Sequence, residues 1–369
     1  MRRQRAVMIG RTVAVLAVVA AVALAAVLVV VLLGGDDDGP DDAGAPTGLA
    51  AAVASAPPGS QRLLWTDWGA VRAELGLDLD AGSGGADVQQ LLDRGYEADL
   101  TSASALLSSA VVMQQDFGFS PATLDWELLA QSPSAASITM RLGGGVGTDE
   151  VAERLAALGY EAPADDGGLW SSDAAEDAVT ATVTPELAFV GLDDERGLVV
   201  ASDSSAGAEA ALAAVADPPT GDDAAPVPPD VVRTVGDAVS AVLYSGAEAC
   251  GSLAMSQADP SEQSAAQSLV ARAGEVSPLT GFAIAALPGG QVRVAMGFET
   301  SETARSDADT RAVLASGPAP GQGGDFSDRF TLDDVVADGD VVRLDLTPVE
   351  GTYVVSDLSS GPVLFATCS

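Results

Sequence analysis

The sequence predicts an α+β protein with an N-terminal transmembrane helix, a flexible linker and an extracytoplasmic region of two repeated strand–helix–hairpin–helix modules. Three observations lead to this prediction. An uncharged apolar run lies near the N-terminus, and a stretch rich in Asp, Gly and Pro follows it. The rest of the 369 residues alternates between strand-like and helix-like hydrophobic patterns. Hairpins placed between helices favour an α+β arrangement over a doubly wound parallel sheet.

The apolar run covers residues 12–33, which contain no charged side chain. As a helix rising about 1.5 Å per residue it would span about 33 Å, enough to cross a hydrocarbon core of about 30 Å. Residues 1–11 precede it as a basic tail containing Arg2, Arg3, Arg5 and Arg11. Basic flanks stay in the cytoplasm. We therefore expect a single-pass plasma-membrane protein with a cytoplasmic N-terminus and an extracellular C-terminal region.

A cleaved signal peptide is the alternative interpretation of this segment. Such a peptide has a shorter apolar region, roughly 7–15 residues, with a small-residue cleavage site beyond it. The Ala-x-Ala pattern of residues 21–23 lies inside the apolar run, and no cysteine follows for lipid attachment. These features favour an uncleaved anchor.

The composition excludes most familiar catalytic chemistry. All 17 basic residues are arginine, and the chain contains no Lys, His or Asn. Without His there is no Ser–His or Cys–His couple and no imidazole ligand for zinc or iron. Without Lys there is no Schiff base and no P-loop lysine. We therefore predict a protein that is not an enzyme, with no catalytic, cofactor-binding or metal-binding residues.

The charge limits the partners. The net charge of the chain is −36, and residues 1–11 contribute four positive charges, so the remainder carries −40. A region this acidic is repelled by nucleic acid and by anionic headgroups. We predict no nucleic-acid partner, contact with the membrane through the chain's own helix, and an envelope protein or ligand of unspecified kind as the partner.

The two cysteines, Cys250 and Cys368, both lie in the exported part. An even number of cysteines in an oxidising compartment favours a disulfide. It would close a loop of 118 positions. A reactive thiol pair is the alternative, but it usually has close C-x-x-C spacing, which is absent here.

Two polar stretches rich in Pro and Gly divide the chain. Residues 34–60 are predicted to be a disordered acidic linker, and residues 218–230 a second linker. The first α+β module, with a helical lead-in, would then cover residues 61–217. The second would cover residues 231–369 and end in a strand, a helix and a strand.

The lead-in contains strand, helix and hairpin patterns in that order. Asp67 is an expected N-cap and Gly76 an expected helix end, because these residue types suit those backbone positions. Ser120 and Pro121 have the same signature of a helix start. The expected elements are a strand at 63–66, helices at 68–75, 87–94 and 101–115, a helix from Pro121, and a hairpin of 126–131 with 136–142.

Each module is expected to repeat four elements, with copies roughly 100 positions apart, too far for a short-period solenoid. The first copy comprises a strand at 137–142, a helix at 149–158, a hairpin of 186–192 with 198–202, and a helix at 205–216. The second comprises a strand at 240–245, a helix at 262–273, a hairpin within 281–298, and a helix at 302–315. The tail adds a strand at 340–346, a helix at 353–358 and a strand at 363–366.

Of all the segments, the glycine-rich stretch "RLGGGVGTDEVAERLAALGY", residues 141–160, most resembles a ligand-binding loop. Its glycines do not fit the dinucleotide pattern G-x-G-x-x-G, and the chain has no P-loop lysine. Asp149 and Glu150 fall in the first helical turn and would oppose a phosphate there. We predict a turn, with Gly147 or Thr148 as the N-cap.

Other polar features have plain interpretations as well. Residues 78–87 resemble the opening of a calcium loop but lack most of its ligands, so a flexible acidic loop is expected, with weak calcium association left open. Acid clusters could supply a glycosidase pair or be solvated turns; they are Asp165/Asp166, Asp193/Asp194/Glu195 and Asp333/Asp334. The tryptophans could grip a glycan or, more commonly, anchor the core; they are Trp65, Trp68, Trp126 and Trp170.

In layout and composition the chain resembles the single-pass exported proteins of unknown biochemical role that are common in GC-rich actinobacteria. The anchor, the linker and the missing catalytic residue types predict a non-catalytic protein for binding or interaction at the cell envelope. One alternative is a carrier that holds a lipid or small apolar ligand between the modules. Another is a hydrolase that uses carboxylates alone.

Overall fold

A computed structural model describes residues 48–165, 167–172, 182–220 and 225–368. The predicted basic tail, with Arg2, Arg3, Arg5 and Arg11, and the predicted transmembrane helix at residues 12–33 lie outside these residues. Within the described ranges, no helix combines the length and the apolar character needed to cross a bilayer. Residues 45–369 belong to one compact unit, and the description below concerns that unit.

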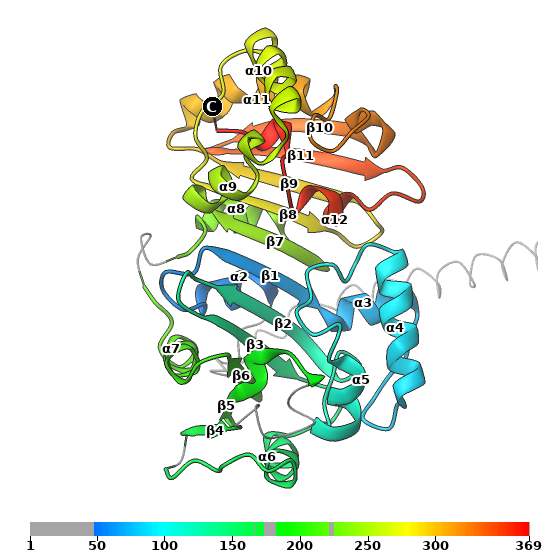
Figure 1. The fold of residues 1–369 in the computed structure, drawn as a ribbon, viewed down its shortest axis with the longest axis vertical. Helices are drawn as coiled ribbons and strands as arrows, with labels where there is room; N and C mark the ends of the chain where they lie inside the picture. Colours follow the sequence, from blue (N-terminus) through cyan, green and yellow to red (C-terminus); the bar gives the residue numbers. More distant parts are fainter. Residues whose placement is uncertain (1–47, 166, 173–181, 221–224, 369) are drawn as a thin grey trace, which may run out of the picture. The chain divides into compact units, whose positions relative to one another are not determined.

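The described residues form helices and one antiparallel sheet of eleven strands, which confirms the α+β class. The strand order is β10-β11-β9-β8-β7-β1-β2-β3-β6-β5-β4 (Figure 1). The first six strands are β1 (Arg62–Asp67), β2 (Leu124–Gln131), β3 (Ala136–Leu142), β4 (Leu169–Ser171), β5 (Phe189–Asp193) and β6 (Leu198–Ser202). The other five are β7 (Ser240–Ser245), β8 (Gly281–Ala286), β9 (Val292–Gly297), β10 (Phe330–Asp338) and β11 (Val341–Pro348).

The sheet contains the same strand order twice. In the first half, residues 48–220, the order is β1-β2-β3-β6-β5; in the second half, residues 225–368, it is β7-β8-β9-β11-β10. Each half is a three-stranded meander followed by a hairpin whose second strand joins the meander. The halves meet where β1 and β7 pair antiparallel, which we call the seam. An approximate two-fold rotation through the seam therefore relates the two halves.

This repeat is not the one predicted from the sequence. The prediction matched β3 with β7, yet β3 pairs with the second strand of its hairpin, β6, whereas β7 pairs with the first strand of its hairpin, β8. The repeating unit instead begins at β1 and at β7. The local hydrophobic pattern missed β10, because a bulge between Leu332 and Asp334 interrupts its alternation. Without β10 the second terminal hairpin could not be recognised.

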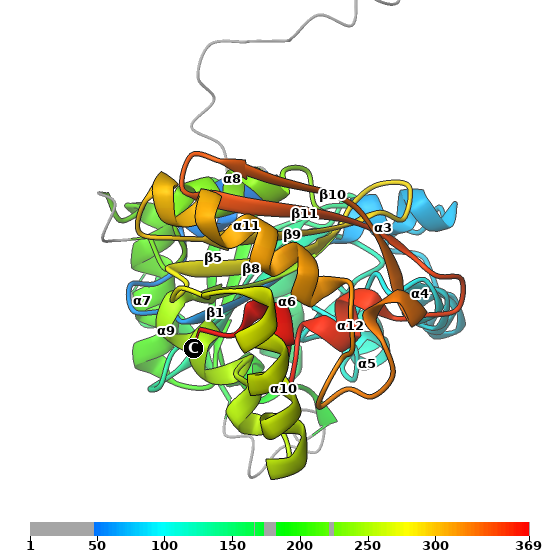
Figure 2. The same ribbon diagram turned by 90° about the horizontal axis from the view of Figure 1, so that it is seen from above.

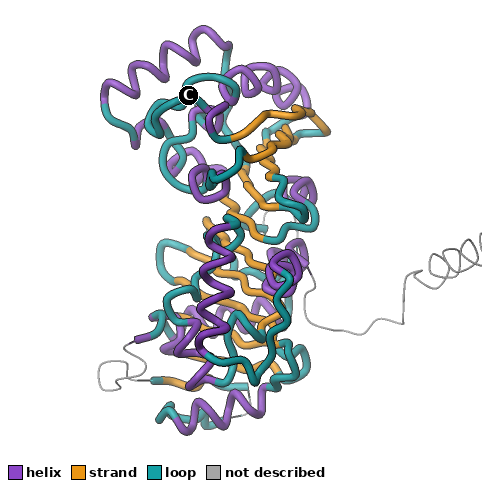
Figure 3. Tube along the Cα trace, turned by 90° about the vertical axis from the view of Figure 1, so that its right-hand side faces the viewer, coloured by secondary structure: helices purple, strands orange, loops and turns teal. Residues whose placement is uncertain are grey.

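Helices cover both faces of the sheet (Figures 2 and 3). One face, which we call the three-helix face, packs against α2 (Gly48–Ala54), α7 (Ser205–Ala216) and α8 (Pro229–Val235). The helices on the opposite face of the first half are α3 (Trp68–Leu75), α4 (Gly85–Glu97), α5 (Ala110–Val112) and α6 (Thr148–Ala157). Those on the opposite face of the second half are α9 (Gly246–Ser252), α10 (Pro260–Ala273), α11 (Ser301–Ala315) and α12 (Val354–Leu358).

Both predicted linkers contain structured residues. Helix α2 lies within the predicted linker 34–60, and it buries Leu49, Ala52 and Val53. These side chains have helical spacing, and α2 packs against α8. Helix α8 itself begins at Pro229, inside the predicted linker 218–230, with Pro in its first turn. Both segments are rich in Ala and Pro and therefore resembled flexible spacers in the sequence. Their few apolar side chains nevertheless belong to the core.

Three further elements differ from prediction. Residues 101–109 are irregular. Of the predicted helix 101–115, only α5 and the start of a π-helical turn, Met113–Phe117, form. Serine-rich segments compete with helix by local hydrogen bonding, and Ser104 Oγ indeed accepts from the Leu106 N–H. The segment after Pro121 is a turn that leads into β2. The predicted strand 363–366 is a 3₁₀ turn, Leu364–Ala366.

The chain end is fastened to the second half in two ways. The predicted disulfide between Cys250, on α9, and Cys368 is present. Close to it, the Arg311 and Asp307 side chains of α11 are 0 % and 2 % exposed and form an ion pair at 3.0 Å. Arg311 also donates to the carbonyls of Phe365 and Thr367. The last residues are therefore held by a covalent bond and by a buried guanidinium.

A second fastening joins the two halves. The buried carboxylate of Asp99, just beyond α4, accepts from the N–H groups of Val355 and Ser356 in the first turn of α12. The rings of Tyr96 and Tyr353 contact each other nearby in a tilted arrangement, with centroids 5.3 Å apart. Asp99 has φ 55°, in the left-handed region that few residues other than glycine adopt. The chain leaves α4 in this conformation and presents the carboxylate to α12.

Candidate functional site

The glycine-rich stretch is a turn and a cap, as predicted. Gly144 and Gly145 have φ values of 60° and 81°, which suit glycine. A Cβ on Gly143 would lie 2.0 Å from the Asp125 carboxylate. Gly147 is the N-cap of α6, whose first turn holds Asp149 and Glu150. The structure gives this stretch an architectural role.

The acidic residues that the sequence offered as candidate ligands or catalytic groups take part in turns, helix caps and ion pairs. Asp80 accepts from the Gly82 N–H, and Asp87 accepts from the Gly84 N–H at the start of α4. Asp193 pairs with Arg196, and Asp334 with Arg343. Asp166 lies outside the described residues. In the part of the chain that the structure describes, no three His, Cys, Asp or Glu side chains are grouped so that they could hold a metal ion.

The tryptophans belong mainly to the core. Trp65 and Trp68 are fully buried and Trp126 nearly so. The Trp65 and Trp126 rings lie 5.3 Å apart, and Trp65 Nε1 donates to the Ala238 carbonyl. Trp170 is half-buried on the short edge strand β4. Three of the four tryptophans are thus unavailable as platforms for a glycan.

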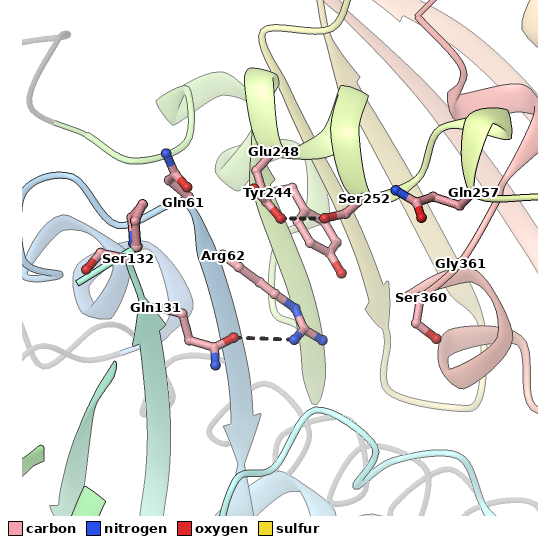
Figure 4. Close-up of a pocket in the computed structure, with 11 residues that line it drawn as sticks. Gln61, Arg62, Gln131, Ser132, Tyr244, Glu248, Ser252, Gln257, Ser360 and Gly361 are labelled. Atoms are coloured by element: carbon pink, nitrogen blue, oxygen red, sulfur yellow. Dashed lines mark hydrogen bonds between the residues drawn. The ribbon is translucent and has the colours of Figure 1, made fainter. Parts of the chain in front are cut away.

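A polar cleft of about 600 Å³ lies at the seam, where β1 begins and β7 ends (Figure 4). We call it the seam cleft. From the first half it is lined by residues at the start of β1 and the end of β2: Gln61, Arg62, Gln131 and Ser132. From the second half it is lined by residues of β7, of α9 and the turn after it, and of the segment just after α12: Tyr244, Glu248, Ser252, Gln257 and Ser360. Both halves are required to form it.

Strand register brings the central residues together. Arg62 is the cross-strand partner of Tyr244 on β7 and of Gln131 on β2, so the three side chains form one row across the sheet. Directly opposite side chains in an antiparallel pair are close neighbours. Helix α9 starts immediately after β7 and carries Glu248 and Ser252 over the end of that row. The cleft therefore depends on the pairing of β1 with β7.

Arg62 is held in place by neutral groups. Its Nη1 donates to Gln131 Oε1 at 3.3 Å, and its Cζ lies 5.6 Å from the centroid of the Tyr244 ring. Its Nε is buried without an acceptor within the described residues. The Tyr244 hydroxyl donates to the Ser359 carbonyl at 2.6 Å. Burial raises the pKa of Tyr244, although the neighbouring Arg62 charge opposes that rise.

Glu248 supplies the negative charge of the cleft. Its carboxylate accepts a hydrogen bond from Ser252, one turn further along α9. Among the described residues, neither Arg62 nor Glu248 takes part in an ion pair. The seam cleft thus offers one cation, one anion, amides and hydroxyls. Such a set can bind a polar ligand, and Glu248 is the one carboxylate among the lining residues.

The sequence did not indicate any of these residues as a site. Arg62 and Tyr244 are separated by almost half the chain, and each resembles an ordinary polar or aromatic residue at a strand end. Their meeting depends on which strands pair across the seam, which local patterns do not encode.

A second polar row crosses the other end of the seam, and it is closed. Thr66 pairs with Ser240 on β7 and with Glu127 on β2, and all three side chains are fully buried. The Glu127 carboxyl accepts from Trp68 Nε1 and from the Ala105 N–H. Burial raises the pKa of Glu127 to about 7, although hydrogen bonds from Trp68, Ser104 and Ala105 oppose that rise.

The stability of the protein should therefore fall as the pH rises toward 7. The folded state keeps the Glu127 proton up to about pH 7, whereas the unfolded state loses it near the ordinary value of 4.5. Between these values the unfolded state binds fewer protons, so the free energy of unfolding decreases, by up to about 3 kcal/mol in total. Urea unfolding of the Glu127→Gln variant should lack this part of the decrease.

Glu209→Gln, an exposed change on α7, provides the matched control and should keep the wild-type dependence on pH. If Glu127→Gln shows the same pH dependence as the wild type between pH 4.5 and 8, Glu127 does not titrate in this range.

No known protein family and no curated protein matches the sequence. Among solved structures, crystal forms I and III of TP0453 give TM-scores of 0.39 and 0.40, each at 9 % sequence identity. The alignments cover 85 % and 83 % of this chain, and 98 % and 97 % of the respective TP0453 chains.

Proposed function

We propose that this protein is a membrane-anchored, extracytoplasmic, non-catalytic binding protein of the cell envelope, and that the seam cleft is its binding site. The apolar run of residues 12–33 and the basic tail before it support the anchor and the topology. The composition of the cleft supports the binding role. It is an open polar cavity with room for a small ligand and with convergent polar groups.

The carboxylates around the cleft are the observation that favours binding over hydrolysis. A hydrolase that relies on carboxylates needs two of them, about 5–9.5 Å apart. Glu248 is the one acidic residue among those that line the seam cleft. Of the acid clusters noted in the sequence, Asp193 ends β5, Asp194 and Glu195 lie in the turn after it, and Asp333 and Asp334 lie on β10. A carboxylate-dependent hydrolase is therefore the weaker proposal.

A carrier of apolar ligands is also a weaker assignment for the seam cleft. Such a carrier needs a deep cavity lined by apolar side chains. The seam cleft is lined mainly by amides, hydroxyls and two charges. Burying an apolar ligand there would leave these polar groups without water or partners, which is unfavourable.

Protease treatment of intact cells tests the topology. We expect residues 60–369 to be digested while a cytoplasmic marker protein survives, and the anchor to remain in the membrane fraction. Protection of residues 60–369 in intact cells would contradict the extracellular assignment. Recovery of a shortened chain from the medium would instead show that the apolar segment is cleaved.

Calorimetric titration of the detergent-solubilised full-length chain tests the binding site. The probes are small polar molecules of several classes: amino acids, short peptides, neutral sugars and dicarboxylates. A Ser360→Trp variant places a bulky side chain at the rim of the cleft, and we expect it to abolish binding of any probe that the wild type binds. Equal binding by both proteins, or no binding of any class, would refute the seam cleft as the site.

A further inference from the structure

We infer that the seam cleft recognises a zwitterion: an amino acid or short peptide with a free ammonium group and a free carboxylate. This inference rests on the proposed function and names the ligand class of the same site. It follows from two opposite charges that share one cleft without neutralising each other.

Arg62 retains donors for a ligand carboxylate. The chain has 53 acidic residues against 17 arginines, yet no described carboxylate pairs with Arg62. A guanidinium carries five N–H donors in a planar fork that suits two carboxylate oxygens. The bond to Gln131 uses one of those donors, and the ring and hydroxyl of Tyr244 also interact with the guanidinium and help to fix it.

Glu248 retains acceptors for a ligand ammonium. A carboxylate has about four acceptor positions, and in the described structure Ser252 takes one of them. Both Glu248 and Arg62 flank Tyr244 (Figure 4). Their charges act on the Tyr244 hydroxyl in opposite directions, as expected for groups beside the same ring. Because Arg62 and Glu248 both line the seam cleft, one ligand in the cleft can contact both charges.

The charge of the whole protein favours a ligand with no net charge. A phosphate or dicarboxylate would be repelled by Glu248 and by the net charge of −36. A simple cation would meet the positive charge of Arg62 inside the cleft. A zwitterion satisfies both groups and feels little long-range repulsion.

The buried position of Tyr244 disfavours a neutral sugar as the ligand. Sugars bind well where they can lie on an exposed aromatic face, but Tyr244 is 2 % exposed and Arg62 lies over its ring. The neutral lining suits a peptide better. Gln131, Gln257 and Ser360 can hydrogen-bond to peptide groups, and a cleft of about 600 Å³ has room for more than one residue.

Four matched peptides test the inference in calorimetric titrations of the detergent-solubilised full-length chain. Dialanine has both charges, N-acetyl-dialanine lacks the ammonium, dialanine amide lacks the carboxylate, and N-acetyl-dialanine amide lacks both. We expect dialanine to bind most tightly. Loss of either charge should weaken binding by about tenfold or more, since charge-assisted hydrogen bonds are the strong ones.

Two variants test which side chain binds each charged group of the ligand. Arg62→Gln should bind dialanine and dialanine amide equally, and Glu248→Gln should bind dialanine and N-acetyl-dialanine equally. Arg305→Gln and Glu209→Gln remove exposed charges elsewhere, and both should retain wild-type discrimination. Thermal unfolding of each variant verifies that it is folded.

Equal binding of dialanine and its doubly capped form would overturn the inference, as would unchanged discrimination in Arg62→Gln. If a sugar or another polar probe binds and is lost in Ser360→Trp while all four peptides fail, the zwitterion inference fails and the proposed function stands. If every probe fails, both fail.

Discussion

Replacing Arg311 with alanine should lower the free energy of unfolding by about 3–5 kcal/mol, the usual result of breaking a buried ion pair from one side. The change leaves the Asp307 carboxylate buried beside Ser277, which donates to it, but without its cation. It also removes the donors to the carbonyls of Phe365, Thr367 and Ser277. Urea unfolding with the disulfide intact measures the effect.

Arg305→Ala, on the exposed side of the same helix, is the matched control and should change stability by no more than about 0.5 kcal/mol. The double variant Asp307→Leu/Arg311→Met should be less destabilised than Arg311→Ala, because no unpaired charge remains buried. A loss below about 1 kcal/mol in Arg311→Ala would show that water or another group replaces the guanidinium.

Removing the disulfide should have an effect of similar size. The Cys250–Cys368 bond closes a loop of 118 positions. A loop of this length stabilises the folded state by about 4–5 kcal/mol in the chain-entropy model, and native disulfides typically contribute about 2–5 kcal/mol. The double variant Cys250→Ser/Cys368→Ser should therefore unfold at a much lower urea concentration, while the oxidised wild type gives the reference.

Mass mapping without reductant should recover the Cys250 and Cys368 peptides linked to each other. Free thiols at both positions in protein isolated without reductant would refute the disulfide. Because Arg311 binds the carbonyl of Thr367, next to Cys368, the two fastenings act on the same segment. A cycle that combines Arg311→Ala with the serine substitutions should show coupling above about 0.5 kcal/mol.

Local sequence signals were enough to place most elements. The predicted helices 68–75 and 205–216 match α3 and α7, because side-chain N-caps mark both starts. Asp67 accepts from the Ala70 N–H and Ser204 from the Gly207 N–H, and Gly76 ends α3 in the left-handed conformation. The disulfide was predictable because the chain has only two cysteines. These features depend on residue type and on near neighbours.

The arrangement of the elements could not be predicted in the same way. The correct repeat requires β10, whose bulge hides its period, and the pairing of β3 with β6 rather than β5. The seam cleft was harder still to predict from the sequence, because it forms only when β1 and β7 pair. Conversely, the glycine-rich stretch resembled a site locally, but its neighbour Asp125 and its own acids give it a structural role.

The repeated strand order has a consequence for how a binding site could arise in this protein. A rotation that exchanges the halves moves the Arg62–Tyr244 pair onto the Ser240–Thr66 pair, so the seam has two equivalent ends. One end is open to solvent. The other is roofed by the longer segment between β1 and β2, residues 68–123, which brings Trp68 and Ala105 onto Glu127. The repeated strand order therefore gives the seam two ends with the same backbone arrangement. The long connection between β1 and β2 covers one end, and the other end remains open as the seam cleft.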